Sequence, residues 1–304
     1  MIFNSEESWN TSAYNKSIPR NFEKIDSPEG IALYLDHTYA RTKRCNYVYH
    51  YTTLSTLVEI LRGRRWHLAN ARNMNDQLEY SYGDPDRWKK IFFSSFMMNA
   101  KESIGMWSMY AQPWASGVKI AIPLAEMKKW IKNKPEIFGV KENKENADKR
   151  FDEYRTSVKI DGVATVLRLS AVAYSNAKNL ESDETEQLTC GEAKNSVIKN
   201  APDIPELTGY VKDKAWDYER ELRLKITFSD EFNYDRVALE VPEYIIDAMT
   251  ITTGPLFEGD LREKLQEEIK QQTKIEHSIF TDRLFIKTIC DNCERLKGGI
   301  TVSA

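Results

Sequence analysis

The sequence has few of the residues that build metal centres and disulfide frameworks. Its 304 residues include only four histidines and four cysteines. The cysteines are Cys45, Cys190, Cys290 and Cys293. A single Cys-x-x-Cys pair has no second pair to complete a zinc site, and four cysteines are too few to form a disulfide framework in a chain of this size. We therefore expect structural or incidental thiols, with metal or redox chemistry as the weaker alternative.

The sequence also lacks long hydrophobic runs and a strong excess of charge. Its apolar stretches, such as 163–172, are far shorter than the ~20 residues that span a bilayer. The N-terminus carries acidic residues where a signal peptide has basic ones. The net charge is only −3, so binding of nucleic acid would need a local basic patch. We expect a soluble cytoplasmic protein with no membrane partner.

Several common motifs are missing as well. The sequence contains no Gly-x-Gly-x-x-Gly, no Gly-x-x-x-x-Gly-Lys-Ser/Thr, no His-Glu-x-x-His and no Gly-x-Ser-x-Gly. These are the signatures of dinucleotide-binding Rossmann domains, P-loop NTPases, zinc proteases and α/β-hydrolases. Any enzymatic site must therefore be built in another way.

What is present is typical of a globular protein of mixed secondary structure, with 41% hydrophobic and 29% charged residues. Residues 1–44 are polar and irregular, with one helix expected at 27–42. Alternating or β-branched patterns predict strands at 47–52, 66–69, 92–97, 117–122, 163–174 and 219–228. Helical spacing predicts helices at 53–62, 104–110, 124–132 and 258–272. Strands and helices without regular βαβ alternation predict an α+β fold.

The first segment that draws attention is the aromatic strand at 47–52. A strand period of two places His50 and Thr52 on one face and Tyr49 and Tyr51 on the other. A histidine and a hydroxyl on one face can reach the same ligand. The alternative is a histidine whose hydrogen bonds are satisfied inside the core.

Two other segments concentrate polar residues. The loop at 70–76 holds three asparagines, which can bind a ligand through their amides or serve only to form turns. In the strand predicted at 219–228, Glu219, Glu221 and Arg223 share one face. Such a row of charges is either a site or the solvent side of a sheet.

Together these segments resemble the bacterial domain-of-unknown-function family 2971 (DUF2971), whose fold is grouped with the ADP-ribosyltransferases. The matching stretches are 49–52 with the leucine-rich helix after it, 75–79, 106–111 with Gly117, 214–223, and the Gly254-Pro255 turn with its following helix. Their order and spacing also agree with the family.

The resemblance covers roughly 45–285. It implies one ADP-ribosyltransferase-like domain with a split mixed β-sheet and flanking helices, between a helical or irregular extension at 1–44 and a tail at 286–304. Gln77 and Leu78 stand where the family more often has proline and an aromatic residue, and Leu222 stands where it often has tryptophan.

The resemblance implies NAD as a substrate and assigns roles to the polar residues. His50 would hydrogen-bond the ribose of the nicotinamide half, and Thr52 or the adjacent backbone would hold the nicotinamide amide. Glu221 would bind the ribose 2′-hydroxyl and stabilise positive charge at the anomeric carbon as nicotinamide leaves. Glu219 would orient or deprotonate the acceptor, and Arg223 would pair with phosphate or neutralise the carboxylates.

The remaining residues that the resemblance places at NAD are Tyr51, Asn75, Asp76, Tyr80, Trp107 and Tyr110. Of these, Tyr80, Trp107 or Tyr110 would stack on the nicotinamide ring. The acceptor would be a protein or a nucleic acid, and the basic run at 62–65 is the only hint of the latter. That run also suits the C-terminal end of a helix dipole.

Three alternatives to ADP-ribosyl transfer stay open. One is an NAD glycohydrolase, with water as the acceptor. Another is a non-catalytic nucleotide-binding or interaction module on the same fold. The third is a different reaction on a nucleotide or nucleic acid, for which the basic run at 62–65 is the only hint. A toxin or phage-defence effector would suit the resemblance, and the sequence leaves the oligomeric state open.

Overall fold

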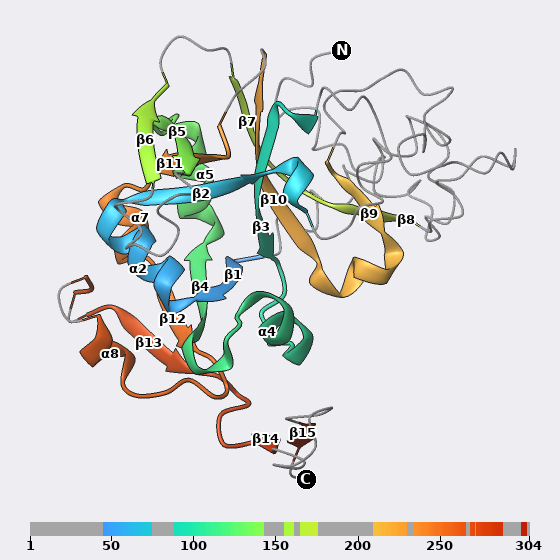
Figure 1. Ribbon diagram of the computed structural model, residues 1–304, viewed down its shortest axis with the longest axis vertical. Helices are drawn as coiled ribbons and strands as arrows, with labels where there is room; N and C mark the ends of the chain where they lie inside the picture. The colour runs from blue at the N-terminus through green and yellow to red at the C-terminus, as the bar shows by residue number, and fades with distance from the viewer. Residues whose placement is uncertain are drawn as a thin grey trace, which may run out of the picture.

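The computed structural model describes residues 45–74, 88–142, 155–160, 165–175, 209–229, 234–265, 268–270, 272–287 and 299–302 (Figure 1). The predicted extension at 1–44, with its helix at 27–42, and most of the tail at 286–304 lie outside these ranges. Three of the four cysteines, and the candidate ligand residues Asn75, Asp76 and Tyr80, also lie outside the described residues.

Most of the described strands belong to one eleven-stranded sheet, in the order β13-β12-β4-β1-β3-β2-β11-β5-β6, with β10 between β3 and β7. Its strands are β1 (Tyr47–Thr53), β2 (Arg65–Asn70), β3 (Ile91–Met97), β4 (Gly117–Pro123), β5 (Ile137–Glu142), β6 (Arg155–Lys159), β7 (Thr165–Ala171), β10 (Glu221–Phe228), β11 (Arg236–Glu240), β12 (Thr250–Thr253) and β13 (Lys274–His277). Neighbouring strands are antiparallel except β12 and β13, which are parallel. The sheet is therefore mixed.

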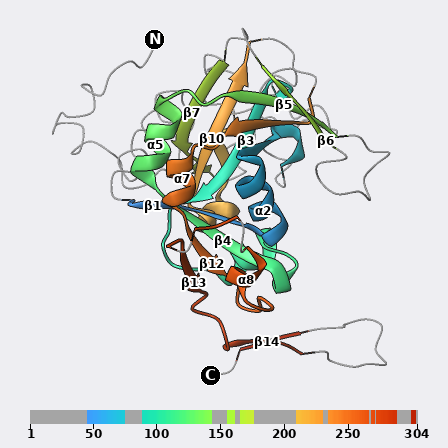
Figure 2. The ribbon, with the colours of Figure 1, turned by 90° about the vertical axis from the view of Figure 1, so that its left-hand side faces the viewer.

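Two small strand pairs lie outside this sheet. β8 (Ala173–Ser175) pairs in parallel with β9 (Val211–Asp213), and β14 (Leu284–Lys287) pairs with β15 (Gly299–Val302). The second pair lies apart from the sheet, at the bottom of Figures 1 and 2.

The sheet divides at β3. One edge of β3 pairs with β10 along its whole length, from Ile91 to Met97. The other edge is shared, because β1 pairs with it at Met97 and β2 pairs with it at Phe92 and Phe93. Between these two contacts, residues 94–96 pair with neither β1 nor β2. We call this gap in the pairing the split, and it confirms the α+β class and the split mixed sheet that were predicted.

Each face of the sheet carries its own core. The larger core packs α2 (Leu54–Gly63), α5 (Leu124–Lys132), α7 (Glu243–Asp247) and α8 (Leu261–Lys264) against the sheet. A smaller core on the other face holds α4 (Ile104–Tyr110) through Met106 and Trp107, which pack with Tyr51 and Met97. Within the described residues no helix is both long and apolar enough to cross a membrane.

Local sequence explains where α2 begins and ends. The Thr53 hydroxyl accepts a hydrogen bond from the Thr56 amide at 3.3 Å, which caps the first turn. The helix ends at Gly63, and Arg64 follows in the left-handed region with φ of 50°. Helices α4 and α5 have the bounds that the sequence predicted, and α2 differs by one residue at each end.

The helix predicted at 258–272 is wrong in its length. Of the described residues in that range, only Leu261–Lys264 are helical, and Asp260 caps them by accepting from the Arg262 amide at 2.6 Å. The chain must turn back soon afterwards because β13 begins at Lys274 beside β12. Arg262 holds this return by donating to the Thr273 carbonyl at 2.8 Å. Tertiary pairing therefore overrides the helical pattern.

The strand predicted at 219–228 begins two residues later than expected. Residues Lys214–Glu219 form a 3₁₀ helix (η9), capped by Asp213. Arg220 then adopts a left-handed conformation, with φ of 44°, and β10 starts at Glu221. The strand predicted at 163–174 similarly divides into β7 and β8 at Val172.

Candidate active site

Glu221 and Arg223 form a buried ion pair at the start of β10. Their side chains lie on the same face of the strand because they are two residues apart. Arg223 donates to Glu221 through Nε at 2.5 Å and through Nη2 at 3.0 Å. Glu221 is 2% exposed and Arg223 is fully buried. The charged row that could have been the solvent side of a sheet is instead inside the protein.

A lysine extends this pair to a second carboxylate. Lys212 on β9 donates to Glu219 at 2.6 Å, and its Nζ lies 3.6 Å from the nearer oxygen of Glu221. The other oxygen of Glu219 accepts from the Tyr110 hydroxyl on α4. Glu219 thus joins the cluster although it belongs to η9, since the turn at Arg220 brings it back beside Glu221.

Backbone groups complete the hydrogen bonding of the ion pair. The Glu221 amide donates to the Tyr174 hydroxyl at 2.8 Å, and Arg223 donates through Nη1 to the Gly209 carbonyl at 2.7 Å. Gly209 has φ of +78°, and a Cβ there would lie 2.6 Å from the Phe93 ring. A glycine at this position therefore lets the carbonyl approach Arg223.

His50 reaches this cluster through Ser95 at the split. Ser95 lies opposite Arg223 in the antiparallel pairing of β3 with β10. The two residues form a non-hydrogen-bonded pair, so the backbone N–H and C=O of Ser95 point away from β10, toward the split. Its carbonyl meets no strand there and instead accepts from His50 Nδ1 at 2.9 Å. The Ser95 hydroxyl donates to Glu221. One serine therefore links two of the residues predicted to be catalytic.

His50 and Glu221 nevertheless lie on opposite faces of the sheet. The register aligns Tyr49 with Met97 and Met97 with Glu221, so these three side chains share one face. His50 projects from the other face, where its ring lies 5.1 Å from Trp66. A ligand that contacts both His50 and Glu221 must therefore pass through the sheet at the split.

The environment sets different charge states for the three titratable groups. Burial lowers the pKa of His50 from 6.5, despite the hydrogen bond to Ser95. Burial raises the pKa of Glu219, and the opposing effect of Lys212 does not cancel it. Burial would also raise the pKa of Glu221, but Arg223 and Lys212 outweigh it and lower the pKa. Glu221 is therefore held anionic, and His50 is neutral near pH 7.

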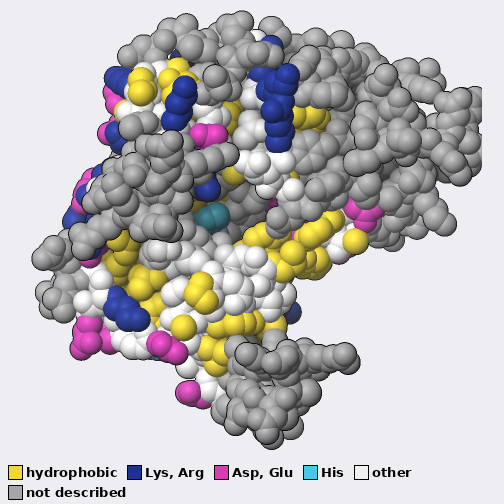
Figure 3. Space-filling view, in the orientation of Figure 1, with side chains coloured by type: hydrophobic (Ala, Val, Ile, Leu, Met, Phe, Trp, Pro, Cys, Tyr) yellow, Lys and Arg dark blue, Asp and Glu magenta, His cyan; other side chains and the backbone are white. Residues whose placement is uncertain are grey.

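The neutral histidine has a defined donor and acceptor. Because a carbonyl only accepts, the proton must sit on Nδ1 of His50. The other ring nitrogen is then an acceptor, and the side chain is only partly buried. On the face shown in Figure 3 the surface is hollowed near its centre.

The aromatic residues proposed to contact NAD differ in their accessibility. Trp107 is fully buried, contacts the Tyr51 ring at 4.8 Å, and donates to Glu102 at 3.1 Å. Trp107 is therefore a core residue in this structure, and Tyr51 and Thr52 are also buried. Tyr110 is partly exposed and lies beside Glu219. Of the aromatic candidates that the structure describes, Tyr110 alone borders the cluster.

The basic run at 62–65 is engaged within the protein. Arg62 pairs with Glu268, and Arg64 pairs with Glu243. Arg65 lies 3.6 Å from the centroid of the Phe138 ring. These contacts favour a structural role for the run over an acceptor-binding role.

The sequence did not point to Ser95, Lys212 or Tyr174. Ser95 had one local signal, because Ser94 and Ser95 interrupt an otherwise apolar strand in which a buried hydroxyl needs a partner. Lys212 and Tyr174 carry no such signal. They reach the cluster only through the pairing of β8 with β9.

Comparisons with known proteins support part of the predicted resemblance. The family described as "Protein of unknown function (DUF2971)" matches residues 106–224, from α4 to the first half of β10. The resemblance to DUF2971 is confirmed over this range, which holds both glutamates and Arg223 but not His50. No curated protein sequence matches the chain significantly.

One solved structure that matches is Thermus sp. 2.9 DarT in complex with NAD+. The alignment covers 76% of this chain and 94% of that chain, with 10% identity and a TM-score of 0.27. This score is below the level that indicates a shared fold.

Proposed function

We propose that this protein has an ADP-ribosyltransferase-like fold, cleaves the bond between nicotinamide and ribose in NAD, and transfers ADP-ribose to a macromolecular acceptor. The observation that carries the proposal is the connection of His50 to Glu221 through Ser95 at the split. The resemblance to DUF2971, matched over 106–224, supports the same assignment. Such an enzyme would suit a toxin or a phage-defence effector.

In this proposal Glu221 and His50 act on the ribose. The Nε2 atom of neutral His50 accepts a hydrogen bond from a ribose hydroxyl. The 2′-hydroxyl donates to Glu221 while the Ser95 hydroxyl keeps its own bond to that carboxylate, whose lowered pKa keeps it anionic. As the C–N bond breaks, its electron pair leaves with nicotinamide, and the Glu221 carboxylate stabilises the positive charge on the ribose.

Glu219 then serves the second half of the reaction. Its raised pKa makes it a better proton acceptor than an ordinary carboxylate at neutral pH. It takes the proton of the acceptor nucleophile as the new bond to the anomeric carbon forms. Lys212, which contacts both carboxylates, keeps the cluster from accumulating two uncompensated negative charges.

A binding module without catalysis is the second candidate. The hydrogen bonds that Glu221 already accepts within the protein favour it. Both oxygens of Glu221 already accept from Arg223, and the side chain is 2% exposed. If this pair does not open, the protein binds a nucleotide without releasing nicotinamide. The two candidates therefore differ in one measurable product.

The link through Ser95 is tested by comparing two adjacent serines. Replacing Ser95→Ala removes the hydroxyl that orients Glu221, and we expect nicotinamide release from NAD to fall roughly tenfold to 100-fold. Ser94→Ala is the matched control, because the Ser94 hydroxyl is also hydrogen-bonded, to Trp66 at 2.9 Å, but lies on the opposite face of the strand. Equal effects of the two substitutions on turnover, at equal stability, would contradict the assignment.

The pH dependence of turnover follows from the charge state of His50. The pKa of His50 is lowered from 6.5, so the neutral ring persists down to that pH. We expect kcat/KM to stay constant from neutral pH to 6.5 and to fall only at lower pH, as the ring gains a proton and Nε2 stops accepting. An acid limb unchanged in His50→Gln would show that His50 does not act in this way.

A further inference from the structure

The outer edge of β7 is open in the described part of the chain. β7 pairs with β10, and no other described strand lies beside it. The Val172 amide donates a hydrogen bond to the Glu221 carbonyl. This bond determines which residues of β7 direct their backbone groups toward β10 and which direct them away. The backbone groups of Leu167 and Leu169 therefore point away from β10, toward the open edge.

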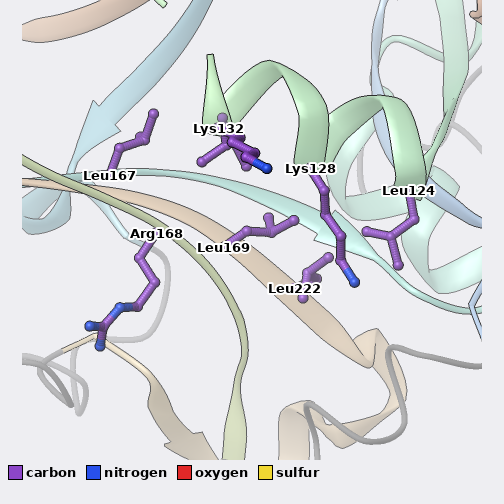
Figure 4. Close-up of a pocket in the computed structure, with 8 residues that line it drawn as sticks. Leu124, Lys128, Lys132, Leu167, Arg168, Leu169 and Leu222 are labelled. Atoms are coloured by element: carbon purple, nitrogen blue, oxygen red, sulfur yellow. The ribbon is translucent and has the colours of Figure 1, made fainter. Parts of the chain in front are cut away.

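A groove runs between this edge and α5. It encloses about 280 Å³. Its apolar lining residues are Leu124, Ile131, Leu167, Leu169 and Leu222. Figure 4 shows the side chains of Leu167, Leu169 and Leu222 pointing toward α5. The leucines of β7 are only partly buried, so the groove leaves apolar surface uncovered along an open strand.

Basic side chains flank the edge on both faces of the sheet. Lys128 and Lys132 come from α5, are exposed, and line the groove. Arg168 lies between the two leucines of β7 and points to the opposite side, away from α5 (Figure 4). No acidic side chain lines the groove among the residues that the structure describes. A negatively charged ligand that follows the edge would meet a cation on either face.

We propose that the β7 edge and this groove bind an extended acidic peptide of a partner protein, with aliphatic residues opposite the β7 leucines, carboxylates on either side of them on that face, and further carboxylates on the opposite face. Its backbone would add a strand beside β7 and pair with the outward groups of Leu167 and Leu169. Aliphatic side chains would cover the leucines, and carboxylates would meet Lys128, Lys132 and Arg168. This inference rests on the fold and the charges alone and does not depend on NAD chemistry.

The probe for this surface is a fluorescein-labelled peptide, Glu-Glu-Val-Glu-Val-Glu-Glu, titrated with the full chain and followed by fluorescence anisotropy. As a strand it places both valines and the two terminal glutamates on one face and the other three glutamates on the opposite face. We expect saturable binding that weakens as salt is added, since the charged contacts are solvent-exposed. The same peptide with lysine in place of glutamate should not bind. Amide exchange at Leu167 and Leu169 should slow when the acidic peptide is present.

A matched pair of charge reversals locates the site. Lys132→Glu should raise the Kd by roughly fivefold, because it replaces an attractive surface charge with a repulsive one. Lys129→Glu makes the same change in the same helix, but Lys129 lies over the Tyr244 ring, outside the groove, and should leave the Kd unchanged. Both positions are exposed, so neither change should affect folding.

Three results would overturn the proposal. The first is the absence of binding at millimolar acidic peptide. The second is equal binding of the acidic and basic peptides, or equal effects of the two charge reversals. The third is a dimer that forms with rising protein concentration and excludes the peptide, which would assign the edge to a second copy of this chain.

Discussion

Replacing Glu221 with glutamine is expected to reduce nicotinamide release from NAD by roughly 100-fold to 1,000-fold, the scale of losing one preorganised electrostatic group. Glutamine keeps the shape of the side chain and can still accept from Arg223. It lacks the negative charge that would stabilise the developing positive charge on the ribose. Release is measured by chromatography of the nicotinamide product at saturating NAD.

The buried position of Glu221 makes a stability control necessary. Glutamine leaves the Arg223 charge less well compensated, so we expect a loss of about 1–3 kcal/mol in the free energy of unfolding. Turnover must therefore be measured below the melting temperature and corrected for the folded fraction. Glu240→Gln, at an exposed residue of β11, controls for the loss of one negative charge. Turnover of folded Glu221→Gln within threefold of wild type would remove Glu221 from the mechanism.

Replacing Arg223 with methionine should destabilise the protein by about 3–5 kcal/mol, the cost of leaving a buried charge without its partner. Arg223 is fully buried and also lies 4.7 Å from the centroid of the Phe93 ring. The free energy of unfolding is measured by urea titration with tryptophan fluorescence. Arg72→Met, at an exposed position, should change it by less than about 0.5 kcal/mol.

A double variant separates the ion pair from simple packing. In Glu221→Gln with Arg223→Met, neither charge of the pair remains, so the loss should be smaller than the sum of the two single losses. Additive losses would mean that Arg223 stabilises the protein through packing and its bond to Gly209. They would also mean that the charge of Arg223 is not what stabilises the Glu221 carboxylate.

Local pattern was sufficient to predict much of the fold. Helical spacing predicted α4 and α5 with their observed bounds, because the apolar face of a helix is defined within a few residues. The helix at 258–272 failed for the opposite reason. Its residues must return to place β13 beside β12, and that requirement comes from a strand distant in the sequence.

The residues of the site divide in the same way, into those that local sequence predicts and those that only strand pairing brings together. The sequence placed Glu219, Glu221 and Arg223 together, and they do meet, although the row of charges is buried and Glu219 belongs to η9. The link through Ser95 could not be foreseen, because it depends on the split that leaves one carbonyl of β3 unpaired. That His50 and Glu221 lie on opposite faces also follows from strand register, which no single segment encodes.

The most direct test of the proposed function is nicotinamide release from NAD by the purified full chain, with and without a cell lysate as a source of acceptors. The account predicts steady release that increases with lysate, together with transfer of label from adenine-labelled NAD to protein or nucleic acid in the lysate. Release without transfer would indicate hydrolysis of NAD by the same site. A folded protein that releases no nicotinamide under either condition would contradict the account and favour a binding module.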